Sequence, residues 1–173
     1  MLEAMEKAYS VLDDVFRKGA FVNIAIKKAE CTEKQLMTGI VYGTVERYYE
    51  CEYIISKLAR SVKPALKSLL YECVYMIGHM RMPAYAVVDA AVNTAGKIFG
   101  SGVRGFVNAV LKNVAAGKVV LPESGNEYEK IKYNAPNFII EKLRSDGFDP
   151  ALFLLPVQKD KVHFRIGRLS DVG

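Results

Sequence analysis

The sequence is poor in the residues that form disulfides and bind metal ions. It holds three cysteines and two histidines among 173 residues, and the cysteines (Cys31, Cys51 and Cys73) form no C-x-x-C pair. Neither a disulfide framework nor a metal site is therefore expected, and a reducing cytoplasm is the expected location. Cys51 and Cys73 are predicted to be buried thiols that pack as small hydrophobic residues.

Long apolar runs are also missing. No stretch approaches the roughly 18 uninterrupted apolar residues of a membrane-spanning helix, so no membrane association is expected. The first residues are acidic and lead into an amphipathic pattern, which is not typical of a signal peptide. Apolar residues make up 51% and charged residues 25% of the chain, values typical of a folded, soluble protein.

Strand-type alternation is nearly absent before residue 120, where apolar residues recur instead at steps of three and four. The first such stripe, over residues 2–16, predicts a helix that Gly19 ends, and a short helix is expected over 20–29. The spacing as a whole predicts an all-α bundle of six to seven helices over residues 1–120.

The middle of the bundle is the most apolar part. A long helical stretch should start at Thr32 and run to about Arg60, with a bend near Gly43. Pro64 suits the first turn of the next helix, which is expected to lie at the centre of the bundle because its apolar stripe is wide. That stripe comprises Leu66, Leu69, Leu70, Cys73, Val74, Ile77 and Met80. Two more helices, over about 84–99 and 103–116, should complete the domain.

Residues 121–173 have a different character and are predicted to form a second, truncated domain. A linker over 121–126 should be followed by helices around 136–145 and 149–156. The alternating run 162–166 predicts a single strand, which needs a partner strand from a sheet outside this chain.

The positive charge is concentrated in one part of the sequence. The net charge is +5, yet residues 61–120 hold seven basic and two acidic side chains, whereas the regions before and after are balanced. This region is either a solvated face or a surface for a polyanion such as RNA. The candidate phosphate contacts are Lys63, Lys67, Arg81, Lys97, Arg104 and Lys112.

No set of residues indicates catalysis. Residues 100–105 fit G-x-G-x-x-G, but a helix is expected before them, so they predict a helix–helix turn rather than a dinucleotide site. Backbone N–H groups there, beside Arg104, are an alternative site for an RNA phosphate. His79 is expected to pack or to cap a helix, and Asp13 and Asp14 to face solvent. Some of the ten tyrosines are expected to stack on bases, but the sequence does not say which.

Three blocks of sequence resemble the NusB-like family. They are Tyr42–Arg47 (YGTVER), Met82–Val92 (MPAYAVVDAAV) and Gly105–Lys112 (GFVNAVLK), in the family's order and spacing. The family includes free antitermination factors, which bind boxA RNA with a ribosomal protein, and the N-terminal domains of rRNA (cytosine-5) methyltransferases. The segments 135–143 and 162–167 resemble the linker region of those methyltransferases.

The resemblance implies a non-catalytic domain that binds and positions RNA, with 16S rRNA as the expected target. It also implies that S-adenosylmethionine and the catalytic residues of the parent methyltransferase belong to a domain that is absent from this chain. An antitermination factor or a helical module that docks a ribosomal protein is the alternative, and a purely structural bundle is a further one.

Overall fold

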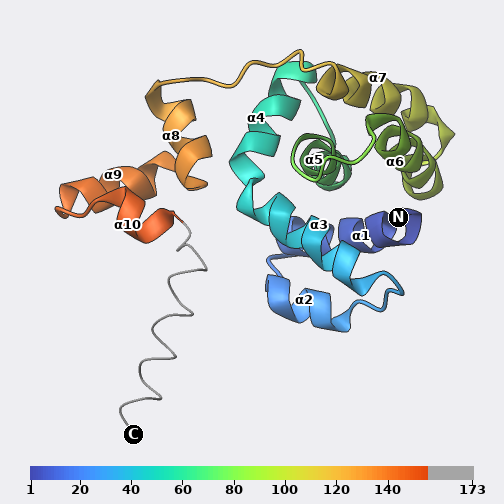
Figure 1. Cartoon of the computed structure of the whole chain (residues 1–173), viewed down its shortest axis with the longest axis horizontal. Coiled ribbons are helices and arrows are strands. Elements are labelled where there is room, and N and C mark those ends of the chain that lie inside the picture. The colour runs from blue at the N-terminus through green and yellow to red at the C-terminus, as the bar shows by residue number, and fades with distance from the viewer. Residues whose placement is uncertain (156–173) are drawn as a thin grey trace, which may run out of the picture. The chain divides into compact units, whose positions relative to one another are not determined.

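The computed structural model describes residues 1–155, and every regular element in this range is helical (Figure 1). The chain divides into two compact units, Met1–Asn134 and a unit that begins at Ala135. Seven α-helices lie within residues 1–120, which confirms the predicted all-α bundle. The strand predicted at 162–166 lies outside the described residues. The first unit contains α1 (Leu2–Lys18), α2 (Val22–Lys28), α3 (Lys34–Glu46), α4 (Tyr48–Leu58), α5 (Pro64–Gly78), α6 (Ala84–Phe99), the 3-10 turn η1 (Ser101–Val103), α7 (Arg104–Ala115) and α8 (Gly125–Tyr133).

The first helix follows the apolar stripe seen in the sequence. Met5 and Leu12 are fully buried, and Gly19 ends α1 in the left-handed conformation, as predicted. The next predicted start is displaced, because Thr32 does not cap a helix. Its backbone N–H and its hydroxyl both donate to the carboxylate of Glu3 on α1, and α3 begins two residues later at Lys34.

Helix α5 is the centre of the bundle, and Pro64 occupies its first turn, as predicted. It contacts α1, α3, α4, α6 and α7, and Figure 1 shows it end-on with these helices around it. Its buried side chains are Leu66, Ser68, Leu69, Leu70, Tyr71, Glu72, Cys73, Val74 and Met76. A helix surrounded in this way must be apolar on nearly all sides, which explains the width of its stripe.

One carboxylate lies within this core. Glu72 is fully buried, and neither of its carboxylate oxygens has a hydrogen-bond partner. Loss of hydration penalises the charged form, so burial raises the pKa of Glu72 well above its ordinary value of 4.5. Burial thus favours the protonated form of this side chain inside the folded bundle.

The bend predicted near Gly43 lies at Arg47, where the chain leaves helical geometry between α3 and α4. Gly43 has another role, since a Cβ there would lie 1.9 Å from the Tyr75 ring, so its absence lets α5 approach α3. The break is possible because Asn134 satisfies the backbone groups beside it. Its Nδ2 donates to the carbonyl of Val45 at 3.0 Å, and its Oδ1 accepts from the N–H of Tyr49 at 3.3 Å.

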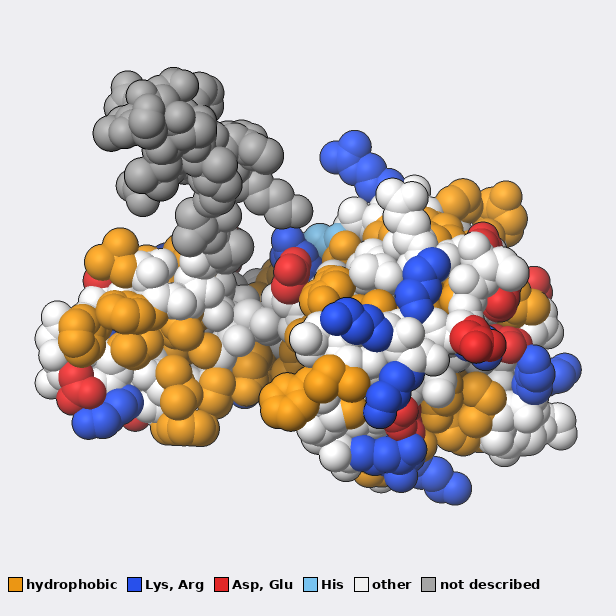
Figure 2. Space-filling view, turned by 90° about the horizontal axis from the view of Figure 1, so that it is seen from below, with side chains coloured by type: hydrophobic (Ala, Val, Ile, Leu, Met, Phe, Trp, Pro, Cys, Tyr) orange, Lys and Arg blue, Asp and Glu red, His pale blue; other side chains and the backbone are white. Residues whose placement is uncertain are grey.

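The second unit contains α9 (Asn137–Ser145) and α10 (Pro150–Leu154), close to the predicted ranges. Asp149 caps α10 by accepting from the N–H of Ala151, and the rings of Phe148 and Phe153 lie 5.1 Å apart. Large apolar side chains are nevertheless exposed here, and hydrophobic surface gathers around these helices (Figure 2). In the described part of the chain, no helix is long and apolar enough to cross a bilayer.

Candidate nucleic-acid interface

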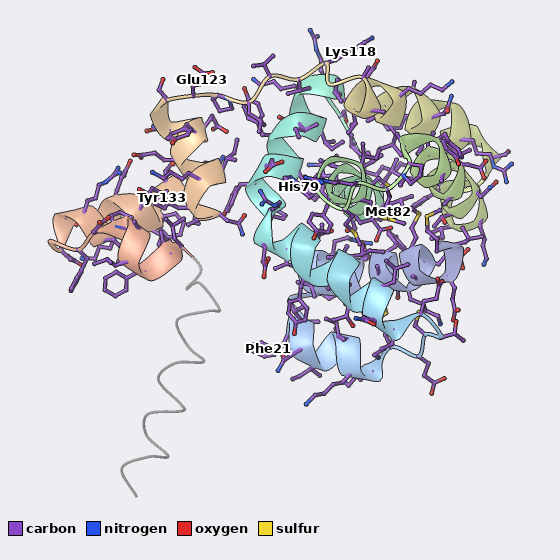
Figure 3. The ribbon with its side chains drawn as sticks, in the orientation of Figure 1. Phe21, His79, Met82, Lys118, Glu123 and Tyr133 are labelled. Atoms are coloured by element: carbon purple, nitrogen blue, oxygen red, sulfur yellow. The ribbon has the colours of Figure 1, made fainter. Side chains whose placement is uncertain are left out.

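The six predicted phosphate contacts fall at three places in the first unit. Lys63 and Lys67 lie at the start of α5, and Arg81 lies in the connection between α5 and α6, next to Met82 (Figure 3). The other three lie on α6 and α7, which pack against each other. The fold therefore does not gather all six residues into one site, and the α6–α7 pair holds the largest group.

A glycine positions Arg104 at the start of α7. The turn before it contains Gly100 in a positive-φ conformation (φ 92°), followed by η1. The Arg104 side chain then lies against Gly96 of α6, where an added Cβ would come within 2.0 Å of Nε. The exposed guanidinium is thus held along the surface of α6 because Gly96 has no side chain. A helix precedes residues 100–105, as predicted, so the strand that a dinucleotide fingerprint requires is not there.

Lys97 on α6 is partly neutralised. Its Nζ lies 2.8 Å from a carboxylate oxygen of Glu6 on α1, and the lysine side chain is well exposed to solvent. Exposed ion pairs of this kind are weak, so Lys97 is able to exchange its carboxylate partner for a phosphate. The ion pair makes Lys97 a weaker candidate for a phosphate contact than a cation that has no such partner.

Lys112 lines a hollow of about 440 Å³ between α6 and α7. The first turn of α6 contributes Tyr85, which is 80% exposed, and α7 contributes Asn108 one turn before Lys112. An exposed aromatic ring, an amide and a cation in one hollow are groups that stack on a base, bond to its edge and contact a phosphate. Asp89 also lines the hollow and lowers its net positive charge.

The sequence did not single out Tyr85 or Asn108. Tyr85 was one of many tyrosines, and only the structure distinguishes it from those that are buried or half-buried in the bundle. Asn108 stands four residues before Lys112 in the GFVNAVLK block, so its helical spacing was a usable signal.

The residues considered for catalysis have structural roles. Nε2 of His79 lies 2.6 Å from a carboxylate oxygen of Glu50 on α4, and its ring stacks on that of Tyr75. Asp13 and Asp14 form ion pairs one turn along α1, with Arg17 and Lys18.

The thiols at Cys51 and Cys73 are buried, as predicted, and burial raises the pKa of both. Within residues 1–155, no three His, Cys, Asp or Glu side chains are grouped so that they could hold a metal ion.

Comparison with known proteins identifies the bundle. Residues 2–116 match the NusB family. The chain is 28% identical over 145 residues to ribosomal RNA small subunit methyltransferase B of Vibrio vulnificus (strain YJ016), an alignment that covers 79% of this chain and 34% of that protein. The protein of the same name from Shewanella oneidensis is 25% identical over 150 residues, with 80% and 34% covered. The chain thus spans about a third of the length of these relatives. Since the match covers most of the chain, including the whole α1–α7 bundle, the chain belongs to the NusB family.

Proposed function

We propose that this chain is the RNA-binding domain of an rRNA-methylating protein, and that it positions 16S rRNA for cytosine-5 methylation without catalysing the reaction itself. The observation that carries the proposal is the α6–α7 hollow, where exposed Tyr85 lies beside Asn108 and Lys112. The similarity to small subunit rRNA methyltransferases over about four fifths of the chain supports rRNA as the target.

The methyl donor of the whole protein is proposed to be S-adenosylmethionine, bound in a further domain. We assign no bundle residue to the cofactor or to the chemistry. Attack of a cysteine on a base requires a thiolate, and burial keeps the thiols of Cys51 and Cys73 protonated. Free cysteines also fit the reducing cytoplasm, which is the proposed location.

The test is an RNA-binding titration with a fluorescent 16S rRNA fragment, using Arg104→Glu/Lys112→Glu. Its matched control is Lys27→Glu/Lys28→Glu on α2, and this variant changes the net charge by the same amount. Within the described residues, α2 contacts only α1 and α3. We expect wild-type affinity to fall steeply with salt, and the α7 variant to bind about tenfold more weakly than the control.

Two results would contradict the proposal. One is an affinity of the wild-type chain for the fragment that does not change between low and moderate salt. The other is negligible RNA affinity together with tight binding of a ribosomal protein, which would favour the alternative of a protein-docking module of the antitermination type.

A further inference from the structure

A second basic hollow lies on the first unit, formed by segments that are distant in sequence. Its volume is about 430 Å³, and its walls are the last turns of α4, the α4–α5 connection, the start of α5, and α8. The lining residues that carry charge are Lys57, Arg60, Lys67, Lys130, Glu52 and Glu127. Four cations thus face two carboxylates, although residues 1–60 as a whole are electrically balanced.

Three of the four cations in this α4–α5–α8 groove form no ion pair with a carboxylate of the described residues. No ion pair in residues 1–155 includes Lys57, Arg60 or Lys67. Lys57 lies over the ring of Tyr53, with Nζ 5.0 Å from the ring centre. Only Lys130 has an acidic partner, Glu127, at 3.4 Å. The groove therefore keeps an excess of positive charge available for an anion.

One wall of the groove comes from outside the bundle that matches the family. Helix α8 follows residue 116, where the match to the NusB family ends. Asn134 fixes its end against the α3–α4 break, and Nζ of Lys130 lies 5.4 Å from the ring centre of Tyr49. The groove is thus a property of this chain with its extension, rather than of the seven-helix bundle alone.

The chemistry of the lining favours a phosphate backbone over a peptide. A docked helical peptide needs exposed apolar pockets for its anchor side chains. None of the large exposed apolar residues in the described part of the chain lines this groove. Arg60 offers a planar fork that binds phosphate oxygens through two hydrogen bonds, and the volume is that of a small-ligand site.

We infer that the α4–α5–α8 groove is a second RNA contact, in which Arg60, Lys57 and Lys67 bind backbone phosphates and Lys130 adds charge from α8. The inference rests on the proposed function, because it assigns a further surface to the same RNA. It extends the RNA path beyond the α6–α7 hollow to a face of which the sequence indicated Lys67 but not Lys57, Arg60 or Lys130.

The test uses the 173-residue chain and a fluorescent single-stranded 16S rRNA oligonucleotide of about 12 nucleotides, titrated at several salt concentrations. We expect Lys57→Glu/Arg60→Glu to weaken binding about tenfold or more and to lower the slope of log affinity against log salt by about one to two. The control Lys27→Glu/Lys28→Glu should stay within about threefold of wild type in the same titration.

Photocrosslinking keeps the inference testable if the double variant folds poorly. With 4-thiouridine in the oligonucleotide, wild-type crosslinks should map to peptides that contain Tyr53 or Lys130. Crosslinks elsewhere only, or a groove variant that binds like the control, would overturn the inference.

Loss of binding in Arg104→Glu/Lys112→Glu alone would leave the proposed function standing, whereas no RNA affinity in wild type would overturn both. Binding of poly-glutamate in place of RNA at the groove would assign it to an acidic protein partner and overturn the inference.

Discussion

The two units of the molecule bury their large hydrophobic residues to very different extents. In the bundle, Leu69 and Met76 of α5 are fully buried, whereas in the second unit Phe138 is 68% exposed and Leu152 is 79% exposed. Within residues 1–155 the cause is the number of neighbouring helices, since five helices surround α5 while α9 and α10 pack against each other. The burial of an apolar side chain thus depends on the surrounding helices as much as on the helix that carries it.

The largest expected effect separates the two units directly. Leu69→Ala removes a fully buried side chain and should lower the free energy of unfolding by about 2–5 kcal/mol, through lost burial and the cavity left behind. Phe153→Ala, at an exposed position of α10, should change the unfolding of the bundle by less than about 0.5 kcal/mol. Urea unfolding measures both. Similar losses for the two variants would show that the second unit is as well packed as the first.

A second prediction concerns the polar group inside the better-packed unit. Glu72 ionises near 4.5 in the unfolded chain but at a much higher pH in the bundle, so wild-type stability should fall as pH rises above 4.5. Glu72→Gln should remove this part of the pH dependence. Glu72→Met, which leaves no unpaired oxygen, should stabilise the bundle at pH 7 by about 1–3 kcal/mol.

Thermal unfolding between pH 4 and pH 8 measures the effect of Glu72. Parallel curves for wild type and Glu72→Gln would mean that the carboxylate is hydrated or paired in solution.

The smallest effect tests where the better-packed unit ends. Asn134→Gly keeps a residue that accepts positive φ but removes the side chain that bonds to Val45 and Tyr49. The cost should be about 0.5–1.5 kcal/mol for each lost hydrogen bond, less if water replaces it. In the variant, amide hydrogen exchange in α8 should be faster than in wild type, whereas exchange in α5 should stay the same. Unchanged exchange in α8 would show that other contacts hold this helix.

Apolar spacing was sufficient to predict the helices that form the core. The stripes of α1, α5, α6 and α7 face inward because burial of these side chains drives the bundle to form. Helix α8 was missed, since its sequence GNEYEKIKY has no such stripe and Tyr133 is its one buried residue. Its position depends on Asn134 and on Lys130, whose partners lie about eighty residues earlier in the chain.

The candidate site was predictable only where its charged residues also lie in a charged stretch of the sequence. A count of charge along the chain found Arg104 and Lys112, which lie on one helix of the α6–α7 pair. The same count passed over Lys57 and Arg60, because acidic residues elsewhere in residues 1–60 balance them in sequence but not in space. The bend was misplaced because Gly43 suggested backbone freedom, whereas the fold uses it for close packing against Tyr75.

The contact between Gly96 and Arg104 determines where one positive charge lies without changing the net charge of the protein. A methyl group at position 96 would push the guanidinium off α6 while every ionisable group remains. Alanine also favours a helix over glycine, by about 0.8–1.0 kcal/mol in helix interiors, and the displaced atoms belong to a flexible side chain. Gly96→Ala should therefore make the bundle more stable and redirect Arg104 at once. Glycine at position 96 thus fixes the direction of the Arg104 side chain, and it does so at the expense of the stability of α6.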